Sequence, residues 1–383
     1  MRIAHFLISM KLEGGGVVRA VIDLVGVLAR SGLEVTLLTF DRGELPSDWI
    51  SGETRGIRVV ELPGRADHRS GQLLSRAQLD AAGDALKQCD LLHLHGAWDV
   101  ANAQLARLAR RRAVPYVISP HGMLDEWAIS HKWLKKRIYF TLLGRRMFER
   151  AAAVHCTAEA EAEQARQWIR PRRLEVLPLA LDLTAYRQLP DAAAKAADIP
   201  VSGRSVLFLS RVHPVKRVEI VIEAIALLRR AGREVILFVA GDGEEAYMAS
   251  LKNLAAKLGV AEAVQWLGMV RGERKLLTFR MADVFALPTF QENFGMVLVE
   301  SMACGTPVVT TRGVDIWREL ESAGATIADA TPEAFADAIA RLLDDEPDRL
   351  DRGRRGREWV LGFLDSDRLA AGYAAFYRSL AGA

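Results

Sequence analysis

Two glutamates, Glu292 and Glu300, stand eight positions apart in the stretch FQENFGMVLVESMACGTPVVTT, residues 290–311. Glu292 follows the apolar run VFALPT, and helical spacing begins after it at Phe294-Gly295. The first N–H groups of a helix have no partner inside the helix, so a phosphate or a sugar hydroxyl can bind there. The helix rises about 9 Å from Phe294 to Glu300, at about 1.5 Å per residue. Two acids at that separation can accept hydrogen bonds from two parts of one polyol ligand, such as a sugar and a ribose.

The same two acids also fit a hydrolytic pair, with one carboxylic acid and one nucleophile. That chemistry requires a particular distance between the carboxyl groups, which spacing along the chain does not supply. The hydrolytic interpretation therefore stays open at this point.

Other polar residues follow predicted strands. Arg211 and Lys216 come after the apolar run SVLFLS, and a guanidinium with an ammonium suits a diphosphate. His121 follows YVISP at the edge of the sheet where ligands bind, and we expect it to contact a ligand. His95 lies in HLHGAWD with Trp98 and Asp99 behind it, and this group could help to bind a polar acceptor.

Two glycine-rich stretches have the form of phosphate-binding loops. Gly15 and Gly16 follow the first predicted strand and open a helix, where backbone amides can approach a phosphate. Gly241 and Gly243 belong to a G-x-G-x-x-A pattern that is typical of dinucleotide-binding proteins. This pattern follows the second strand of its half, whereas the fingerprint normally lies after the first. An NAD-dependent oxidoreductase that uses residues 241–243 remains an alternative.

Short apolar runs alternate with helical patterns along all 383 residues, which predicts parallel sheets covered by helices. The alternation lapses at 184–204, which we interpret as a link between two doubly wound α/β domains. We expect an N-terminal Rossmann-like domain at 1–185, completed by a C-terminal helix at 365–383, and a second Rossmann-like domain at 186–364.

Composition excludes several classes of function. A net charge of +3 does not indicate a nucleic-acid partner, and three distant cysteines form neither a disulfide framework nor a zinc motif. The Asp365-Ser366-Asp367 triplet precedes a helical pattern, so we interpret it as a helix cap and expect no metal site. No uncharged run approaches the roughly 20 residues of a membrane span, and we predict a cytoplasmic protein.

The stretch 127–150 mixes Trp, Tyr and Phe with seven lysines and arginines. Basic amphipathic helices with aromatic residues bind membrane surfaces, and the alternative is a helix with a solvated basic face. We therefore predict a peripheral contact with the inner face of the cytoplasmic membrane.

The ordered set of motifs resembles the retaining GT-B glycosyltransferases of family 4. It comprises the first glycine loop, SPHG, SRVHPVK, AGDGEE, the two glutamates with Phe294-Gly295, and ESMACGTPVV. The resemblance covers nearly the whole chain and implies two Rossmann-like domains that face each other across a cleft. The HGML stretch with its basic continuation further resembles bacterial exopolysaccharide and lipopolysaccharide sugar transferases.

The resemblance also implies roles for individual residues. Gly15, Gly16, Arg211 and Lys216 would bind the donor diphosphate, and the two cations would stabilise the leaving group. Gly241 would contact the donor. Glu292 would hold the donor sugar with the backbone around Asn293, Phe294, Gly295 and Met296, while Glu300 would hold the ribose. His121 would approach the sugar near the reacting carbon and take part in catalysis, and Val270 would lie beside the nucleobase. One departure is Arg217, because Gly often follows the lysine in the family.

The implied reaction moves a hexose from a GDP- or UDP-linked donor to a glycan or lipid-linked acceptor, with retention and without a metal or other cofactor. A GT-B epimerase or hydrolase of nucleotide sugars is the remaining alternative.

Overall fold

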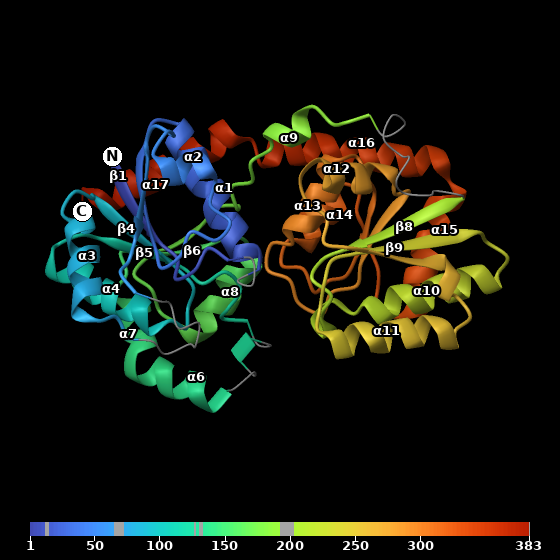
Figure 1. Ribbon diagram of the computed structural model, residues 1–383, viewed down its shortest axis with the longest axis horizontal. Helices are drawn as coiled ribbons and strands as arrows, with labels where there is room; N and C mark the ends of the chain where they lie inside the picture. The colour runs from blue at the N-terminus through green and yellow to red at the C-terminus, as the bar shows by residue number, and fades with distance from the viewer. Residues whose placement is uncertain (12–14, 65–72, 126–127, 130–132, 192–202, 383) are drawn as a thin grey trace. The chain divides into compact units, whose positions relative to one another are not determined.

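The computed structural model describes residues 1–11, 15–64, 73–125, 128–129, 133–191 and 203–382 (Figure 1). The chain divides into two compact units. Unit 1 comprises Met1–Asp182 and Leu364–Ala383, and unit 2 comprises Leu183–Phe363. Unit 1 therefore takes its last helix from the C-terminal end of the chain.

Unit 1 is built on a parallel sheet of seven strands in the order β3-β2-β1-β4-β5-β6-β7. The inner strands are nearly continuous runs of buried residues, as expected for a parallel sheet covered on both faces. The strands are β1 (Arg2–Phe6), β2 (Glu34–Thr39), β3 (Ile57–Glu61), β4 (Leu91–His95), β5 (Tyr116–Ser119), β6 (Ala153–Cys156) and β7 (Leu174–Val176).

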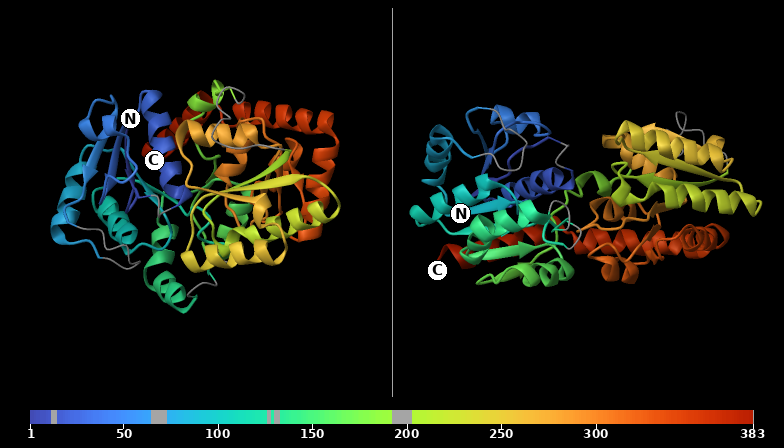
Figure 2. Two further views of the ribbon diagram at one scale, coloured as in Figure 1. Left: turned by 45° about the vertical axis from the view of Figure 1, so that its right-hand side comes forward. Right: turned by 90° about the horizontal axis from the view of Figure 1, so that it is seen from below.

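Helices cover both faces of this sheet (Figures 1 and 2). They are α1 (Gly16–Arg30), α2 (Ser47–Ser51), α3 (Arg76–Leu86), α4 (Val100–Arg111), α6 (Trp133–Tyr139), α7 (Arg145–Glu149), α8 (Glu159–Trp168) and α17 (Ser366–Ala381), with one π-helical turn, η2 (Phe140–Gly144), between α6 and α7.

The last helix, α17, is anchored in unit 1 at its start and along its buried face. Asp365 caps it, because its Oδ1 accepts a hydrogen bond of 3.0 Å from the N–H of Arg368. The predicted cap is thereby confirmed. Tyr373 and Tyr377 of α17 are fully buried in unit 1, where their hydroxyls meet His155 and His93.

Unit 2 is built on a six-stranded parallel sheet in the order β10-β9-β8-β11-β12-β13. Its strands are β8 (Arg204–Leu209), β9 (Val235–Ala240), β10 (Val264–Gly268), β11 (Val284–Leu287), β12 (Val308–Thr310) and β13 (Thr326–Ile327). Its helices are α9 (Thr184–Arg187), α10 (Val218–Arg230), α11 (Glu245–Lys257), α12 (Gly272–Met281), α13 (Met296–Ala303), α14 (Trp317–Ser322), α15 (Pro332–Asp344) and α16 (Glu346–Phe363), with short 3₁₀ turns η4 (Pro214–Lys216) and η5 (Ala261–Ala263).

The strand orders confirm the predicted fold class of two doubly wound parallel α/β units. The order reverses between β1 and β4 in unit 1 and between β8 and β11 in unit 2. Ligands of such sheets bind beyond the carboxyl ends of the strands at the point of reversal. The loops after these four strands are therefore where a site is expected.

Part of the predicted interdomain link is ordered structure of unit 2. Residues Thr184–Arg187 form α9, and Tyr186 is buried. Residues 192–202 of the link lie outside the described part of the chain.

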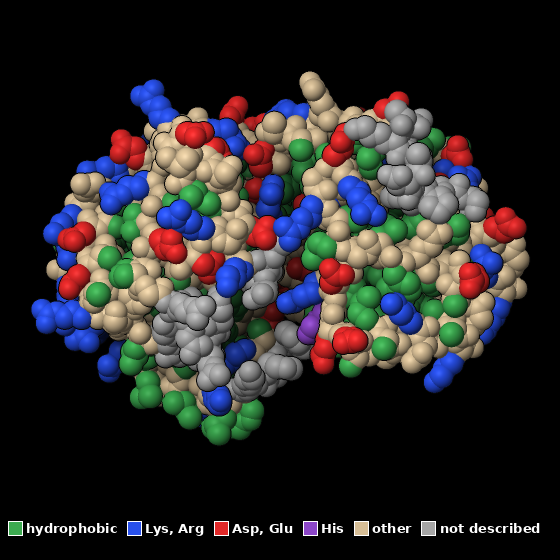
Figure 3. Space-filling model, in the orientation of Figure 1, with side chains coloured by type: hydrophobic (Ala, Val, Ile, Leu, Met, Phe, Trp, Pro, Cys, Tyr) green, Lys and Arg blue, Asp and Glu red, His purple; other side chains and the backbone are tan. Residues whose placement is uncertain are grey.

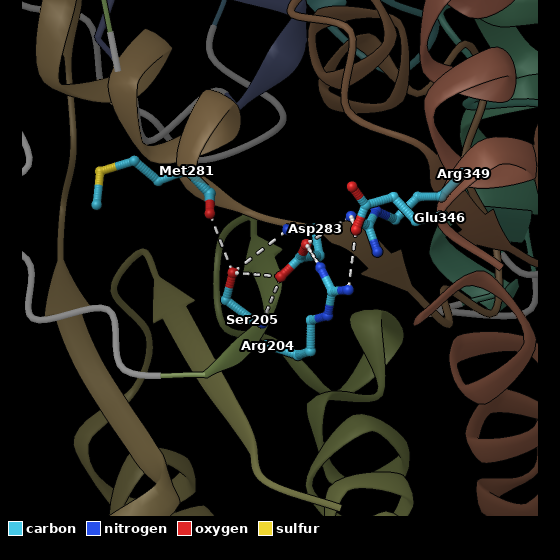
Figure 4. A network of polar contacts seen from close by, with 6 residues as sticks. All are labelled: Arg204, Ser205, Met281, Asp283, Glu346 and Arg349. Atoms are coloured by element: carbon cyan, nitrogen blue, oxygen red, sulfur yellow. Dashed lines mark hydrogen bonds and ion pairs between the residues drawn. The ribbon is translucent and has the colours of Figure 1, made fainter. Parts of the chain in front are cut away.

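A polar network lies at the amino ends of the unit 2 strands, opposite the loops where a site is expected (Figure 4). Asp283, just before β11, accepts a hydrogen bond of 2.8 Å from the backbone N–H of Ser205 and contacts Arg204 and Arg349, each at 3.2 Å. Glu346 joins both arginines from α16. The network ties α16 to the amino ends of β8 and β11, away from the loops that follow these strands.

Within the described residues, no helix combines the length and the hydropathy needed to cross a membrane.

Candidate functional site

The centre of the candidate site in unit 2 is an ion pair between Lys216 and Glu292. Lys216 ends the η4 turn after β8, and Glu292 follows β11, so the two loops meet at the reversal of strand order. The turn is capped by His213, whose Nδ1 accepts a hydrogen bond of 3.2 Å from the N–H of Val215. Lys216 is 8% exposed, whereas Arg211 on the same loop is exposed. The structure thus joins two residues that the sequence placed 76 positions apart.

The backbone conformation at position 217 explains why the family often has glycine where this chain has Arg217. Its φ is +52°, the left-handed conformation that glycine adopts without strain. Its guanidinium lies 4.7 Å from the centre of the Phe290 ring, a cation–π contact that can offset part of this strain.

Helix α13 begins at Met296, four residues after Glu292. Gly295 precedes it with a φ of +68°, and a Cβ atom there would lie 2.7 Å from Cδ1 of Leu298. Phe294 is buried and anchors the turn, while Asn293 and Met296 are partly exposed. No side chain caps this helix in the described structure, so its first amides are available to an anionic or hydroxylated ligand.

Glu300 is held by two residues that sequence reasoning missed. Nζ of Lys275 lies 2.6 Å from both of its carboxylate oxygens, and the hydroxyl of Tyr186 donates to Oε1 at 3.0 Å. Glu300 is only 5% exposed, so a charge partner offsets the desolvation of its carboxylate. Lys275 lies on α12 and Tyr186 lies in the predicted link, and no spacing pattern connects either one to Glu300.

The glycines at 241 and 243 have a structural explanation. A Cβ at Gly241 would lie 1.9 Å from the carbonyl oxygen of Ser210, and one at Gly243 would lie 2.0 Å from that of Val212. Both positions need glycine because the backbones after β8 and β9 run against each other. The G-x-G pattern therefore does not require a dinucleotide. Val270, the predicted neighbour of a nucleobase, is buried after β10.

The site residues of unit 1 include a network of buried histidines. His5 of β1 and His93 and His95 of β4 are at most 1% exposed, and His155 of β6 is equally buried. Nδ1 of His5 lies 3.0 Å from Nε2 of His95, and Nδ1 of His95 lies 2.9 Å from Nε2 of His121. Burial lowers the pKa of His5 and His121 to about 3 and that of His95 well below its usual value.

His95 requires a correction. Both of its ring nitrogens are hydrogen-bonded to other histidines and its side chain is buried, so it cannot contact an acceptor directly. Ring nitrogens of His5, His93 and His95 also lie within 4.8 Å of one another, a grouping from two strands that sequence spacing did not reveal. Both nitrogens of His93 are occupied by Tyr377 and Ser119, at 2.8 and 2.7 Å. These rings therefore form a hydrogen-bond network.

The turn that presents His121 is fixed by Glu161, another residue that sequence reasoning missed. His121 and Gly122 have φ values of +53° and +73°. The N–H of Gly122 donates to Oε1 of Glu161 at 2.7 Å, and the N–H of Thr157 donates to Oε2 at 2.6 Å. Glu161 is 1% exposed and lies on α8, so a buried carboxylate holds the strained turn from behind.

The remaining predicted residues of unit 1 lie at the same edge of the sheet. Gly15, with a φ of +69°, precedes α1, and Gly16 is its first residue. Trp98 donates from Nε1 to the carbonyl of Met123 at 3.0 Å and lies under the ammonium of Lys136. Asp99 is partly exposed, and desolvation raises the pKa of its carboxyl.

Each of the two units matches a known family of proteins. The family model described as Glycosyl transferases group 1 matches residues 191–359, and the one described as Glycosyl transferase 4-like domain matches residues 15–180. The chain belongs to the group 1 glycosyltransferases. Among the relatives of this glycosyltransferase is D-inositol 3-phosphate glycosyltransferase of Mycobacterium tuberculosis, 29% identical over 359 residues, which cover 86% of this chain and 70% of the relative.

Solved structures share the fold over almost the entire glycosyltransferase chain. HepE of Anabaena, in complex with UDP and glucose, matches with a TM-score of 0.80 and 20% identity, covering 99% of this chain and 100% of HepE. WaaG, a glycosyltransferase involved in lipopolysaccharide biosynthesis, matches with a TM-score of 0.74 and 18% identity, covering 98% and 99%. These matches confirm the predicted GT-B fold, and the family confirms that the chain is a glycosyltransferase enzyme.

Proposed function

We propose that this glycosyltransferase moves a hexose from a nucleotide-sugar donor, GDP- or UDP-linked, to a hydroxyl of a glycan or lipid-linked acceptor, with retention of the anomeric configuration. The observation that carries the proposal is the Lys216–Glu292 pair beside the uncapped start of α13. Cations and helix amides at one point suit a diphosphate, and a carboxylate beside them suits sugar hydroxyls. The solved complex of HepE with UDP and glucose supports a UDP-linked donor, and the name of the relative, D-inositol 3-phosphate glycosyltransferase, supports transfer of a sugar to a hydroxyl group.

In this proposal the residues of the site have separate roles. Arg211 and Lys216 stabilise the negative charge that develops on the departing diphosphate, which lowers the barrier because the cations are already in place. Glu292 and the first amides of α13 hold the sugar, and Glu300 holds the ribose. Gly15, Gly16 and His121 have the donor contacts that the family resemblance implies. Trp98 and Asp99 contact the acceptor, a role inferred from their position after HLHG.

We further propose that the reaction needs no metal, because the two cations take the position of charge that a metal would supply. The test is a turnover screen over common nucleotide sugars, with lipid-linked and free glycans as acceptors, in the presence and absence of excess EDTA. We expect transfer of sugar from at least one nucleotide sugar at an unchanged rate in EDTA. Loss of turnover in EDTA, restored by Mg²⁺ or Mn²⁺, would contradict metal independence. Release or isomerisation of the sugar without an acceptor would indicate a hydrolase or epimerase instead.

A second proposal concerns peripheral binding to a membrane. The helical segment 133–146 exposes five large apolar side chains and several basic ones, and Figure 3 shows hydrophobic side chains gathered over α6 at the bottom of the view. The apolar residues are Trp133, Leu134, Ile138, Leu142 and Leu143, between 41% and 64% exposed. Residues 127 and 130–132 of the predicted basic helix lie outside the described part of the chain. An exposed apolar patch bordered by Lys135, Arg137 and Arg146 fits an anionic lipid surface, and we propose that it binds the cytoplasmic face of the inner membrane.

Vesicle co-sedimentation tests this proposal. We expect binding to vesicles with anionic lipid and much weaker binding to neutral ones. Replacing Lys135 and Arg137 by Gln should weaken binding roughly 30-fold, at about 1 kcal/mol per basic residue. Leu134→Ser with Leu142→Ser should also weaken it, whereas Leu350→Ser is the matched control, because Leu350 is 62% exposed in unit 2. Equal binding by all variants would show that this segment is not the docking surface.

A further inference from the structure

Three hydrogen-bonded imidazoles form a line that ends at His121. His5 contacts His95 at 3.0 Å, and His95 contacts His121 at 2.9 Å, each time through one Nδ1 and one Nε2 atom. His5 and His95 are buried, whereas His121 is partly exposed after β5. Only the His121 end of the line can therefore meet a ligand.

The number of protons in this line is fixed by its burial. Because the pKa values of all three rings are lowered by desolvation, each ring is neutral near pH 7 and carries one N–H. The two contacts between rings use two of the three protons. The third proton must lie at one end of the line, on Nε2 of His5 or on Nδ1 of His121.

Nε2 of His5, the buried end of the line, is the less favourable place for the third proton. Nε2 of His5 is buried and has no hydrogen-bond partner among the described residues. A buried N–H without an acceptor is rarer in proteins than an unsatisfied acceptor. Placing the proton on His121 leaves only a bare lone pair at His5, and Nδ1–H of His121 can then donate to water or to a ligand.

We propose that His5 and His95 are positioning residues that hold His121 in its Nδ1–H tautomer, so that His121 donates a hydrogen bond to a hydroxyl oxygen of the donor sugar. This inference rests on the proposed function, from which the sugar contact of His121 is taken. His121 then does not act as a general base, because its Nε2 lone pair accepts from His95 and its Nδ1 already carries a proton. Glu161 supports the same arrangement by fixing the backbone of the turn at Gly122.

The tautomer can be measured on the wild-type protein without any substrate. Long-range ¹H–¹⁵N spectra of protein labelled with ¹⁵N-histidine distinguish a protonated from an unprotonated ring nitrogen, and the His121→Asn spectrum assigns the signals. We expect a protonated Nδ1 and an unprotonated Nε2 for His121. The opposite tautomer would overturn the proposal, as would stoichiometric zinc in the purified protein that shifts the signals of His5 and His95 when it is removed.

A pair of variants tests the positioning role, with UDP-glucose and UDP as the probes. The amide N–H of Asn can replace Nδ1–H of His95, so His95→Asn should bind UDP-glucose within threefold of wild type. His95→Leu removes this donor and should bind UDP-glucose about tenfold more weakly while its affinity for UDP stays unchanged. Equal losses in both variants, or equal losses for both ligands, would indicate a purely structural role. A wild-type protein that fails to bind UDP-glucose would count against that donor, and the tautomer measurement would still decide the inference.

Discussion

Between pH 7.5 and pH 5, the free energy of unfolding of unit 1 should fall by of the order of 8 kcal/mol. Four of its histidines, His5, His93, His95 and His155, are at most 1% exposed. Burial lowers the pKa of His5 to about 3 and of His155 to about 4, and those of His93 and His95 well below 6.5. In the unfolded chain the same rings protonate near pH 6.5.

Whether the free energy of unfolding rises or falls with pH depends on which state binds more protons. Below about pH 6.5 each of these four buried rings binds a proton in the unfolded chain that the folded unit excludes, so stability is lost as the pH falls. The partly exposed His121, whose pKa is also lowered to about 3, acts in the same direction and would add to this loss. Each excluded proton costs about 2 kcal/mol at pH 5, which for four rings approaches the whole stability of a typical domain, about 5–15 kcal/mol. Asp23 acts in the opposite direction, because burial raises its pKa to about 6. Its protonation in the folded state offsets only about 1 kcal/mol at pH 5.

Hydrogen exchange followed by mass spectrometry along a urea titration, at several pH values, reports the two units separately. Unit 2 is an internal reference, since it contains a single histidine, His213, against seven in unit 1. His5→Leu should reduce the pH slope of unit 1 by about 1.4 kcal/mol per pH unit, the value for one proton. Thr39→Ala, at another fully buried position of the same sheet, should lower stability equally at every pH. A flat profile for unit 1 between pH 7.5 and pH 5 would mean that the rings accept protons in the folded state.

The sequence was sufficient to predict the fold class and the position of the candidate site. Parallel strands buried on both faces leave apolar runs that are easily recognised, and ligand-binding loops must follow the strands at the reversal of order. Lys216 and Glu292 each follow such a strand, so their meeting follows from topology. The same principle placed His121 correctly at the end of β5.

The partners of these residues could not be predicted, because they depend on which helix packs where. Lys275 lies in a charged stretch of α12 that resembles a solvated helix face, and its pairing with Glu300 depends on how α12 packs. His95 is the last residue of β4 and His121 lies just after β5, yet the side chain of His95 is buried in the unit and that of His121 is partly exposed. His93 and His95 share a strand face by their spacing of two, but nothing in the sequence states that β1 and His5 pair with that strand.

The second large effect concerns Lys216. We expect Lys216→Met to lower turnover by 10²–10³, because removing one preorganised donor from a developing negative charge costs roughly 3–4 kcal/mol. Lys216→Met with Glu292→Gln separates this loss from the cost of an unpaired carboxylate, and should be equally inactive. Lys252→Met is the matched control, since Lys252 is an exposed lysine of unit 2 that lies 5.7 Å from the Trp266 ring.

Binding measurements on the two glutamates complete this experiment by separating charge chemistry from positioning. Glu300→Ala should weaken the binding of free nucleotide and nucleotide sugar alike, because the ribose is common to both. Glu292→Ala should spare the free nucleotide and weaken only the nucleotide sugar. Calorimetric titration with both ligands measures the difference. If Lys216→Met keeps turnover within threefold of wild type, Lys216 does not stabilise the leaving group. If both glutamate variants bind every ligand like wild type, the assignment of the sugar to Glu292 and of the ribose to Glu300 is wrong. The physical reason to expect separable effects is the geometry, since Lys216 is paired with Glu292 and Glu300 has its own partner in Lys275, so either acid can be changed while the other ion pair stays in place.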